Sequence, residues 1–344
     1  MTDDPTGGAT TGSDPTSGSP VLSVRDLTVR IGTRRGIAHV VNGISYDVHA
    51  GETLAIVGES GSGKTVAALA VMGLLDETAR VTGQALLDGT DLLTAGERQL
   101  RRVRGNRIAM VFQDPMTSLN PVKTIGSQLV EPIVLHGLAA GAAARDRAVE
   151  LLDQVGLPDA RRRLDDYPHH FSGGMRQRVM IAMALACEPR VLLADEATTA
   201  LDVTTQAQIL DVVAGLQQRL GLAVVWITHD LGVVAGIADR VAVMYAGRIL
   251  EEAGVDDLYA APRHPYTVGL LAAVPRVGVE RPRRLATIPG QPPDPTALPP
   301  GCAFYPRCGY RHDPRAADEV PPLRTVAAAH RVACFYDLPA DRDG

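Results

Sequence analysis

The sequence lacks several features that would define other classes of protein. No uninterrupted apolar run approaches the roughly 18–20 residues that a membrane-spanning helix needs. Residues 1–20 have neither the basic start nor the apolar centre of a signal peptide, and their Asp, Thr, Gly, Ser and Pro content predicts a disordered tail. A net charge of −5 provides no broad basic field, so nucleic acid is not an expected partner. These absences favour a soluble, cytoplasmic globular protein.

Cysteine is also scarce, with four residues in a chain of 344. In a reducing compartment these thiols are not expected to form structural disulfides. Cys187 lies in the apolar segment IAMALAC and is predicted to be a small buried side chain. The other three, Cys302, Cys308 and Cys334, lie near the C-terminus and form a separate group.

The glycine-rich segment GESGSGKT at residues 58–65 fits the phosphate-binding pattern G-x-x-x-x-G-K-[ST]. A predicted strand, Glu52–Val57, precedes it and a predicted helix, Val66–Leu75, follows it, as this motif requires. Its glycines allow backbone N–H groups to turn toward a phosphate at the positive end of the helix. The segment predicts a nucleotide site made by Gly58, Glu59, Ser60, Gly61, Ser62, Gly63, Lys64 and Thr65.

Lysine is the rarest basic residue, since only Lys64 and Lys123 are lysines among 34 basic residues. One of these two lies inside the phosphate loop, where a compact ammonium fits between phosphates better than a planar guanidinium. Lys64 is therefore expected to bridge the β- and γ-phosphates, and the Thr65 hydroxyl to bind Mg²⁺.

An apolar segment further along the chain ends in two carboxylates. Val191–Asp195 is a predicted strand, and Glu196 follows it directly. Asp195 at the strand end is expected to lie beside the Mg²⁺ ion, and Glu196 is expected to act as the base that polarises the attacking water.

Two further predicted strands lead into polar residues. Leu222–Thr228 is followed by His229, and the apolar residues before Gln113 form another short strand. Because ligands bind at the carboxyl ends of parallel strands, both side chains are expected near the phosphates. His229 is a candidate contact of the γ-phosphate and the attacking water, and Gln113 a candidate ligand of Mg²⁺ or that water.

A second glycine-rich segment, FSGGMRQR at residues 171–178, also has the features of an anion site. With GESGSGKT, Gln113, LLADEA, TALD and His229 in this order, the sequence resembles the ATP-binding cassette (ABC) ATPases over about Val21–Gly254. In that family the signature of one cassette faces the nucleotide held by another. The resemblance implies a head-to-tail dimer enclosing two ATP molecules. Ser172, Gly173, Gly174 and Met175 would contact ATP in trans, and Asp202 would contact the opposite phosphate loop.

A simpler interpretation of Ser172 is that it caps the following helix, which is compatible with an anion site. Two positions depart from the family pattern. Phe171 and Met175 stand where the signature usually has leucine and glutamine. Ile31 stands where the family usually has an aromatic residue that stacks on adenine, so base recognition stays open.

The resemblance implies an α/β P-loop NTPase fold with a RecA-like core, an antiparallel β subdomain and a helical subdomain that carries the signature. We expect the disordered tail at residues 1–20, the ATPase domain at 21–254 with its helical subdomain at about 115–189, and a C-terminal domain at 255–344 that contains proline and cysteine. Hairpins are predicted near Leu87–Thr90 and through Ala246–Gly247.

Two segments after the cassette are similar to the tail of the oligopeptide and dipeptide importer ATPases. They are HPYT at His264–Thr267 and GCAFYPRC at Gly301–Cys308, and a proline-rich connector separates them. The signature FSGGMRQR and the run Gln113–Pro121 look like the same branch. The resemblance implies a subunit that hydrolyses ATP at the cytoplasmic face of the membrane to energise the uptake of di- or oligopeptides.

The expected partners are two membrane permease subunits, a second ATPase subunit that is a different chain, and an extracytoplasmic peptide-binding protein. A short cytoplasmic helix of the permease would sit between the helical subdomain and the Gln113 loop. Alternatives are an importer ATPase for nickel or another small solute, and a soluble ABC ATPase acting on ribosomes or DNA. The soluble class usually has two cassettes, a long coiled-coil insertion or a basic segment, and the sequence shows none of these.

The tail cysteines have three interpretations. In related ATPases four tail cysteines are associated with an iron–sulfur cluster, but Arg315 stands at the place of the usual third cysteine. A [4Fe-4S] cluster or a zinc ion on Cys302, Cys308 and Cys334 would need a fourth ligand, for which His312, Asp313 and His330 are candidates. The remaining interpretation is a set of reduced thiols packed among aromatic side chains.

Overall fold

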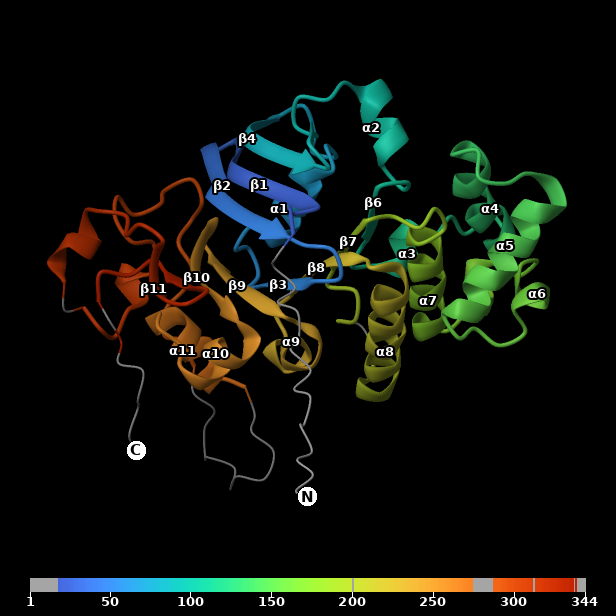
Figure 1. Cartoon of the computed structure of the whole chain (residues 1–344). Coiled ribbons are helices and arrows are strands. Elements are labelled where there is room, and N and C mark those ends of the chain that lie inside the picture. The colour runs from blue at the N-terminus through green and yellow to red at the C-terminus, as the bar shows by residue number, and fades with distance from the viewer. Residues whose placement is uncertain (1–17, 200, 275–286, 312, 337, 339–344) are drawn as a thin grey trace, which may run out of the picture.

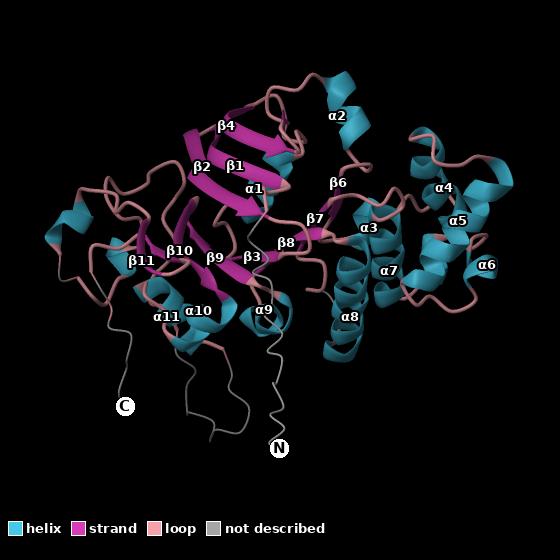
Figure 2. Ribbon diagram, viewed as in Figure 1, coloured by secondary structure: helices cyan, strands magenta, loops and turns pink. Residues whose placement is uncertain are grey.

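The computed structural model describes residues 18–338, with the exception of 200, 275–286, 312 and 337. Most of the predicted disordered tail, residues 1–17, and the candidate ligand His312 lie outside the described residues. Figure 1 shows a central sheet, an antiparallel sheet above it, a helical part on one side and the C-terminal segment on the other. Figure 2 shows the same view by secondary structure.

The strands form two sheets in the described part of the chain. The four-stranded sheet has the order β2-β1-β4-β5, and the eight-stranded sheet the order β11-β12-β10-β9-β3-β8-β7-β6. The strands are β1 (Leu22–Thr33), β2 (Gly36–Val48), β3 (Thr53–Val57), β4 (Ala79–Leu87), β5 (Thr90–Asp91), β6 (Ile108–Val111), β7 (Val191–Asp195), β8 (Ala223–Thr228), β9 (Arg240–Tyr245), β10 (Arg248–Gly254), β11 (Arg324–Ala327) and β12 (His330–Val332).

The helices flank the central sheet (Figure 2). The α-helices are α1 (Lys64–Val71), α2 (Glu97–Val103), α3 (Pro115–Ser118), α4 (Ile125–Leu135), α5 (Gly141–Gln154), α6 (Ala160–Arg163), α7 (Gly173–Ala184), α8 (Val203–Leu220), α9 (Leu231–Ile237), α10 (Val255–Ala260) and α11 (Pro265–Ala272). Short 3-10 helices are η1 (Pro168–His170), η2 (Tyr305–Arg307) and η3 (Pro314–Ala317).

The centre of the large sheet is parallel, with β9, β3, β8, β7 and β6 side by side. All residues of β3, β7 and β8 are buried, as expected for strands covered on both faces. A separate hydrophobic core lies on each face of the sheet, and successive strand residues point into different ones. In β8, Val224 packs with the helical part, and Val225 packs with α1 and the antiparallel sheet. The predictions of strands at these three segments are confirmed.

The two predicted hairpins are confirmed. Leu87 pairs with Thr90 across Asp88 and Gly89, both at positive φ, and Tyr245 pairs with Arg248 across Ala246 and Gly247, also at positive φ. Two consecutive positive φ values are the geometry of a type I′ turn, which matches the twist of antiparallel strands.

The helical part consists of α3 to α7, and its core is continuous with one face of the central sheet. Cys187 is 6% exposed within this core, as predicted for a small buried side chain. All four cysteines are free thiols.

The C-terminal segment is part of the main sheet. β12 pairs antiparallel with β10, which itself pairs with β9, so β11 and β12 extend the sheet that holds the phosphate loop. The carboxylate of Glu251 in β10 is fully buried and accepts the backbone N–H groups of Arg263 and His264 at 2.6 and 2.9 Å. It also contacts Nε2 of His330 in β12 at 2.7 Å.

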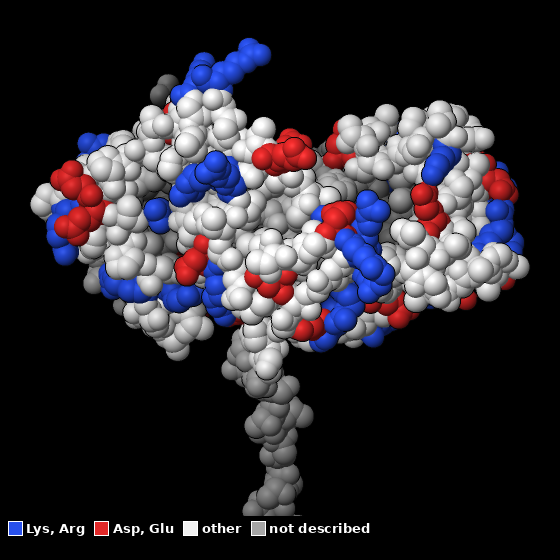
Figure 3. Space-filling model, turned by 90° about the horizontal axis from the view of Figure 1, so that it is seen from above, with Lys and Arg blue, Asp and Glu red and all other residues white. Residues whose placement is uncertain are grey.

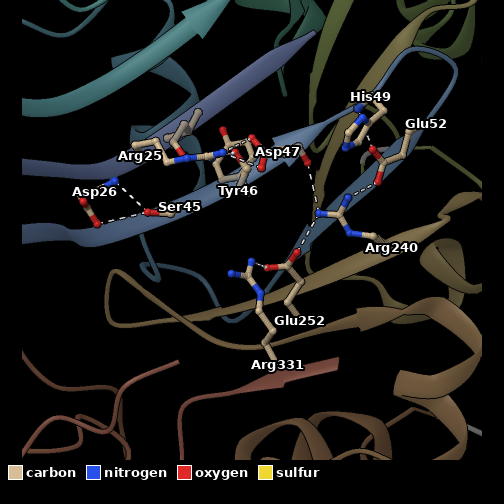
Figure 4. A network of polar contacts seen from close by, with 11 residues as sticks. Arg25, Asp26, Ser45, Tyr46, Asp47, His49, Glu52, Arg240, Glu252 and Arg331 are labelled. Atoms are coloured by element: carbon tan, nitrogen blue, oxygen red, sulfur yellow. Dashed lines mark hydrogen bonds and ion pairs between the residues drawn. The ribbon is translucent and has the colours of Figure 1, made fainter. Parts of the chain in front are cut away.

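An ion network also connects the tail to the sheet (Figure 4). Arg240 in β9 contacts Glu52 at 2.5 Å and Glu252 at 2.8 Å, and it donates to the Asp47 carbonyl of β2 at 3.2 Å. Glu252 pairs in turn with Arg331 of β12. The network therefore links both sheets and the C-terminal segment, and the partners of each charge offset the cost of burying it.

The surface carries charges of both signs. On the face seen in Figure 3, Lys and Arg side chains are interspersed with Asp and Glu side chains. In the part of the chain that the structure describes, no helix combines the length and apolar character needed to cross a membrane.

Candidate functional site

The phosphate loop connects β3 to α1 and fits tightly against neighbouring backbone. A Cβ at Gly58 would lie 2.1 Å from the Met244 carbonyl oxygen. A Cβ at Gly63, where φ is 101°, would lie 2.5 Å from the Val40 carbonyl oxygen. Glycine is therefore required at both positions, by close approach and, at Gly63, by left-handed backbone geometry.

The Lys64 side chain is buried inside the loop. Its ammonium donates to the carbonyls of Gly58 and Glu59 at 2.8 and 3.0 Å and to the Ser62 hydroxyl at 3.2 Å. Burial lowers the pKa of Lys64, and nearby carboxylates oppose that shift. The loop thus surrounds the Lys64 ammonium with oxygen acceptors. When a nucleotide binds, a phosphate oxygen can take the place of one of these acceptors.

Thr65 and Asp195 meet at the end of β7. The Thr65 hydroxyl donates to Oδ1 of Asp195 at 3.0 Å, although the two residues are 130 positions apart. Burial raises the pKa of the Asp195 carboxyl, while the hydrogen bond from Thr65 opposes the rise. A hydroxyl beside a buried carboxylate is a pair of hard oxygen ligands, so the donor set fits Mg²⁺.

Glu196 lies at the centre of a polar cluster. Oε2 accepts from Nε2 of Gln113 at 2.7 Å, and Oε1 lies 3.0 Å from Nδ1 of His229. The Thr199 hydroxyl also donates to Oε2 at 3.4 Å. The backbone of Glu196 has φ of 45°, a conformation that costs energy for a residue with a Cβ and clusters at functional sites.

One cavity of about 660 Å³ brings most of these residues together. Its volume is in the range of small-molecule pockets. The sequence-predicted residues that line it are Gly58, Glu59, Ser60, Gly61, Gly63, Lys64, Thr65, Gln113, Glu196 and His229. Ser62 and Asp195 do not line it, but each is hydrogen-bonded to a residue that does.

Apolar residues that the sequence analysis missed also line the cavity. Val40 comes from β2 and Leu270 from α11 in the C-terminal segment. Ile31, at the place of the expected adenine contact, is not among the lining residues that the structure describes. No local pattern marks Val40 or Leu270, because their position depends on how β2 and α11 pack against the loop.

The signature residues do not line this cavity, judged on the described residues. Ser172 is exposed and caps α7, because its hydroxyl accepts the Met175 N–H at 3.3 Å. Gly174 at the start of α7 packs closely on α8, because a Cβ at Gly174 would lie 2.4 Å from Cγ2 of Thr205. Asp202 caps α8 through Thr205 N–H at 2.9 Å, so the signature and Asp202 lie close together on one surface.

The three tail cysteines line one small cavity of about 30 Å³. This volume holds about one or two water molecules. Burial raises the pKa of each thiol, that of Cys334 to about 11.

Two of the candidate fourth ligands, Asp313 and His330, have other partners. Asp313 is paired with Arg315 at 2.6 Å, and the Arg315 guanidinium lies 4.6 Å from the Phe335 ring centre. His330 is paired with Glu251. Within the described ranges, no three His, Cys, Asp or Glu side chains are grouped as metal ligands. Among the residues that the structure describes, the three cysteines therefore have no fourth ligand grouped with them for a four-thiolate cluster or a zinc ion, and His312 lies outside the described residues.

Comparison with protein families identifies two regions of the chain. Residues 41–199 match the family model described as ABC transporter, and residues 250–314 match that described as oligopeptide/dipeptide transporter, C-terminal region. The chain is 50% identical over 321 residues to the oligopeptide transport ATP-binding protein OppD of Salmonella typhimurium, covering 93% of this chain and 95% of that protein. It is also 50% identical to the OppD of Escherichia coli, covering 92% and 93%.

Solved structures show the same fold. A dimeric structure of the ATP-binding cassette MJ0796, in a post-hydrolysis state bound to ADP and Pi, is 28% identical with a TM-score of 0.62. The match covers 68% of this chain and 98% of that one. The protein is therefore an ABC ATPase, and the predicted fold class is confirmed. Within that class, the chain belongs to the family of oligopeptide transport ATP-binding proteins.

Proposed function

We propose that this protein is the ATP-hydrolysing subunit of an ABC importer that takes up di- or oligopeptides. The main support is the cavity that joins the phosphate loop to Gln113, Glu196 and His229 in a chain whose tail matches the oligopeptide/dipeptide transporter region. As an importer ATPase the protein would act at the cytoplasmic face of the membrane.

The cavity residues have the geometry for phosphoryl transfer to water. Lys64 holds the β- and γ-phosphates, Glu196 accepts the proton of the attacking water, and His229 keeps Glu196 and the γ-phosphate aligned. Thr65, Asp195 and Gln113 would hold Mg²⁺, which offsets phosphate charge when bound. Because the fold positions these groups before ATP arrives, little reorganisation is needed during the reaction.

The complete site requires a second cassette. The signature residues Ser172, Gly173 and Gly174 contact the nucleotide of the partner, and Asp202 contacts its phosphate loop. Two observations support this arrangement: the signature residues are not among the described residues that line the cavity of their own chain, and the similar MJ0796 structure is dimeric. The partner cassette is a second ATPase chain of different sequence, and the assembly includes an extracytoplasmic peptide-binding protein.

A groove on the helical side is proposed to bind the permease. It has a volume of about 720 Å³ and lies between the central sheet, α4 and α7. Its lining includes Leu74, Phe112 and Leu135, which are 42%, 39% and 76% exposed. Exposed apolar side chains of this size favour a partner that covers them, here a short amphipathic cytoplasmic helix of one permease subunit.

We expect Leu135→Asp to lower co-purification of the permease by about tenfold, because a carboxylate would be buried against the docking helix. Affinity purification of the tagged chain from detergent-solubilised membranes, with immunoblotting of the permease, measures this. Ile37→Asp is the matched control, since Ile37 is 60% exposed on β2 outside the groove. Equal recovery from Leu135→Asp and the control would place the permease elsewhere.

The same purification tests the importer assignment when all co-purifying chains are identified by mass spectrometry. Recovery of permease subunits and a second cassette is expected. Recovery of ribosomal or chromosomal proteins without any membrane protein would instead support a soluble ABC ATPase.

The cargo is tested by uptake in cells. A strain without this protein is expected to lose import of a labelled tripeptide, and the wild-type gene, but not Glu196→Gln, is expected to restore it. Loss of nickel uptake with normal tripeptide uptake would assign the importer to a different solute.

For the tail we propose reduced, packed thiols in place of an iron–sulfur cluster or zinc. Protein purified without oxygen is expected to contain less than about 0.1 equivalents of iron or zinc, because a thiolate site needs a fourth ligand and none of the described residues is grouped with the three thiols as one. Elemental analysis measures the content, and Cys308→Ser is the control for adventitious metal. Near-stoichiometric metal that Cys308→Ser removes would overturn this proposal.

A further inference from the structure

Two residues 248 positions apart join the phosphate loop to the C-terminal segment. Glu59 lies inside GESGSGKT, and Arg307 lies inside the tail motif GCAFYPRC. The Arg307 guanidinium binds the Glu59 carboxylate with two parallel hydrogen bonds, Nη1 to Oε2 at 2.8 Å and Nη2 to Oε1 at 3.1 Å. Such bidentate pairs are stronger and more directional than single contacts.

The Arg307 side chain is 6% exposed and rigidly anchored. Nη1 also donates to the Tyr245 hydroxyl at 3.3 Å, Nε donates to the Pro289 carbonyl at 2.9 Å, and Nη2 donates to the Ile288 carbonyl at 3.3 Å. These bonds use the full set of guanidinium donors. The guanidinium also lies 5.7 Å from the ring centre of Tyr245 and 6.0 Å from that of Phe304.

The tail contacts the nucleotide site at other points. The backbone N–H of Glu59 donates to the Tyr266 hydroxyl at 2.9 Å, and Leu270 on the same helix, α11, lines the cavity. The connector reaches the strand that supplies Val40, because His39 N–H donates to the Pro295 carbonyl at 2.8 Å. Helix α11 and Arg307 therefore contact the loop directly, and Pro295 contacts the strand β2 that supplies Val40.

The pair has an electrostatic consequence for ATP. Glu59 lines the cavity that would hold a triphosphate, so an unpaired carboxylate there would repel the ligand. Arg307 neutralises the Glu59 carboxylate and, through two hydrogen bonds, holds it against the C-terminal segment. Lysine could not replace it fully, because an ammonium cannot make the bidentate contact together with the other bonds.

We propose that the C-terminal segment sets the conformation and charge of the phosphate loop through Arg307, which is a positioning residue for ATP binding. The proposal rests on the ATP site described under the proposed function. It gives the tail motif a role that does not depend on its cysteines.

The test is the affinity of the full-length chain for Mg²⁺-ATP in a set of variants. Arg307→Ala is expected to raise the Kd by about tenfold, the size expected for losing a charge-assisted pair. In the assembled transporter, KM for ATP should rise by a similar factor while kcat stays within about twofold. Adding Glu59→Gln to Arg307→Ala is expected to return the Kd to within about twofold of the wild-type value, because it removes the uncompensated carboxylate.

Rescue separates positioning from a structural role, since Glu59→Gln does not repair a misfolded tail. Arg311→Ala is the matched control: Arg311 lies in the same segment, but its guanidinium contacts only the carbonyls of Pro306 and Cys308 and the Tyr305 ring among its described partners. Unchanged affinity in Arg307→Ala, or a loss that Glu59→Gln does not rescue, would overturn the proposal.

Two further variants keep the test decisive. If Arg307→Ala does not fold, Arg307→Lys replaces it, with an expected loss of about threefold that Glu59→Gln abolishes; wild-type affinity in Arg307→Lys would count against the proposal. Lys64→Ala distinguishes an error about the ATP site from an error about the role of Arg307. If Lys64→Ala loses ATP binding and Arg307→Ala does not, the ATP site is correct and the role proposed for Arg307 is wrong. If Lys64→Ala binds ATP normally, the ATP site itself is wrong.

Discussion

Glu196→Gln is expected to lower the rate of ATP hydrolysis by about 10³-fold, within the range that a general base contributes. Glutamine has the same shape as glutamate and can accept the hydrogen bond from Nε2 of Gln113. It cannot accept a proton from water, so ATP binding should persist while turnover stops. Phosphate release by the assembled transporter measures the rate, and equilibrium binding of Mg²⁺-ATP measures affinity.

Two results make this experiment specific. Glu150→Gln, an exposed glutamate on α5, is the matched control and should hydrolyse ATP at the wild-type rate. In Glu196→Gln the ATP-bound dimer should accumulate, which gel filtration of the variant with ATP detects. Hydrolysis within about tenfold of the wild-type rate would show that another group accepts the proton.

The place of Glu196 in the polar cluster is a feature that could be predicted from sequence. Asp195 ends a buried strand, Glu196 follows it, and the strand that precedes His229 runs parallel beside it. Parallel pairing brings these strand ends to one edge of the sheet, so each local pattern already specifies a place in the site. The same reasoning applies to the phosphate loop, whose strand, glycines and helix are contiguous in the chain.

The contribution of the tail could not be predicted in this way. Pairing of β12 with β10 joins segments about 80 residues apart, and neither strand shows a long alternating pattern. The contact between Glu59 and Arg307 depends on the packing of Phe304 and Tyr245 beneath the guanidinium. Long-range contacts of this kind follow from the packed tertiary structure, and a single sequence contains no local signal for them.

The tail cysteines show a different case, in which a local pattern predicts that residues lie together without deciding what they bind. Their spacing resembles a metal-binding tail, and the three thiols do line one cavity. Arg315 stands at the missing position and packs on Phe335, so it contributes an ion pair and a ring contact where a thiolate would otherwise bind metal. Ligand count, and not spacing alone, decides the chemistry of such a group.

Lys64→Ala is expected to weaken Mg²⁺-ATP binding by about 10²-fold, the loss of a charge-assisted phosphate contact in a buried site. The ammonium is held by three loop oxygens at 2.8, 3.0 and 3.2 Å, in a space bounded by backbone. The planar guanidinium of Lys64→Arg cannot enter this space without opening the loop. Its affinity should therefore fall as far as that of Lys64→Ala.

Lys123→Ala is the matched control, because Lys123 is the other lysine in the sequence and pairs with the exposed Glu131 at 2.9 Å. Its affinity for ATP should equal that of the wild type in equilibrium binding. Wild-type affinity in Lys64→Arg would mean that the site recognises only positive charge. A chain with 34 basic residues and two lysines would then have no physical reason to keep one of them in its phosphate loop. A deficit in Lys64→Arg equal to that in Lys64→Ala would instead show that the compact shape of the ammonium is what the loop requires.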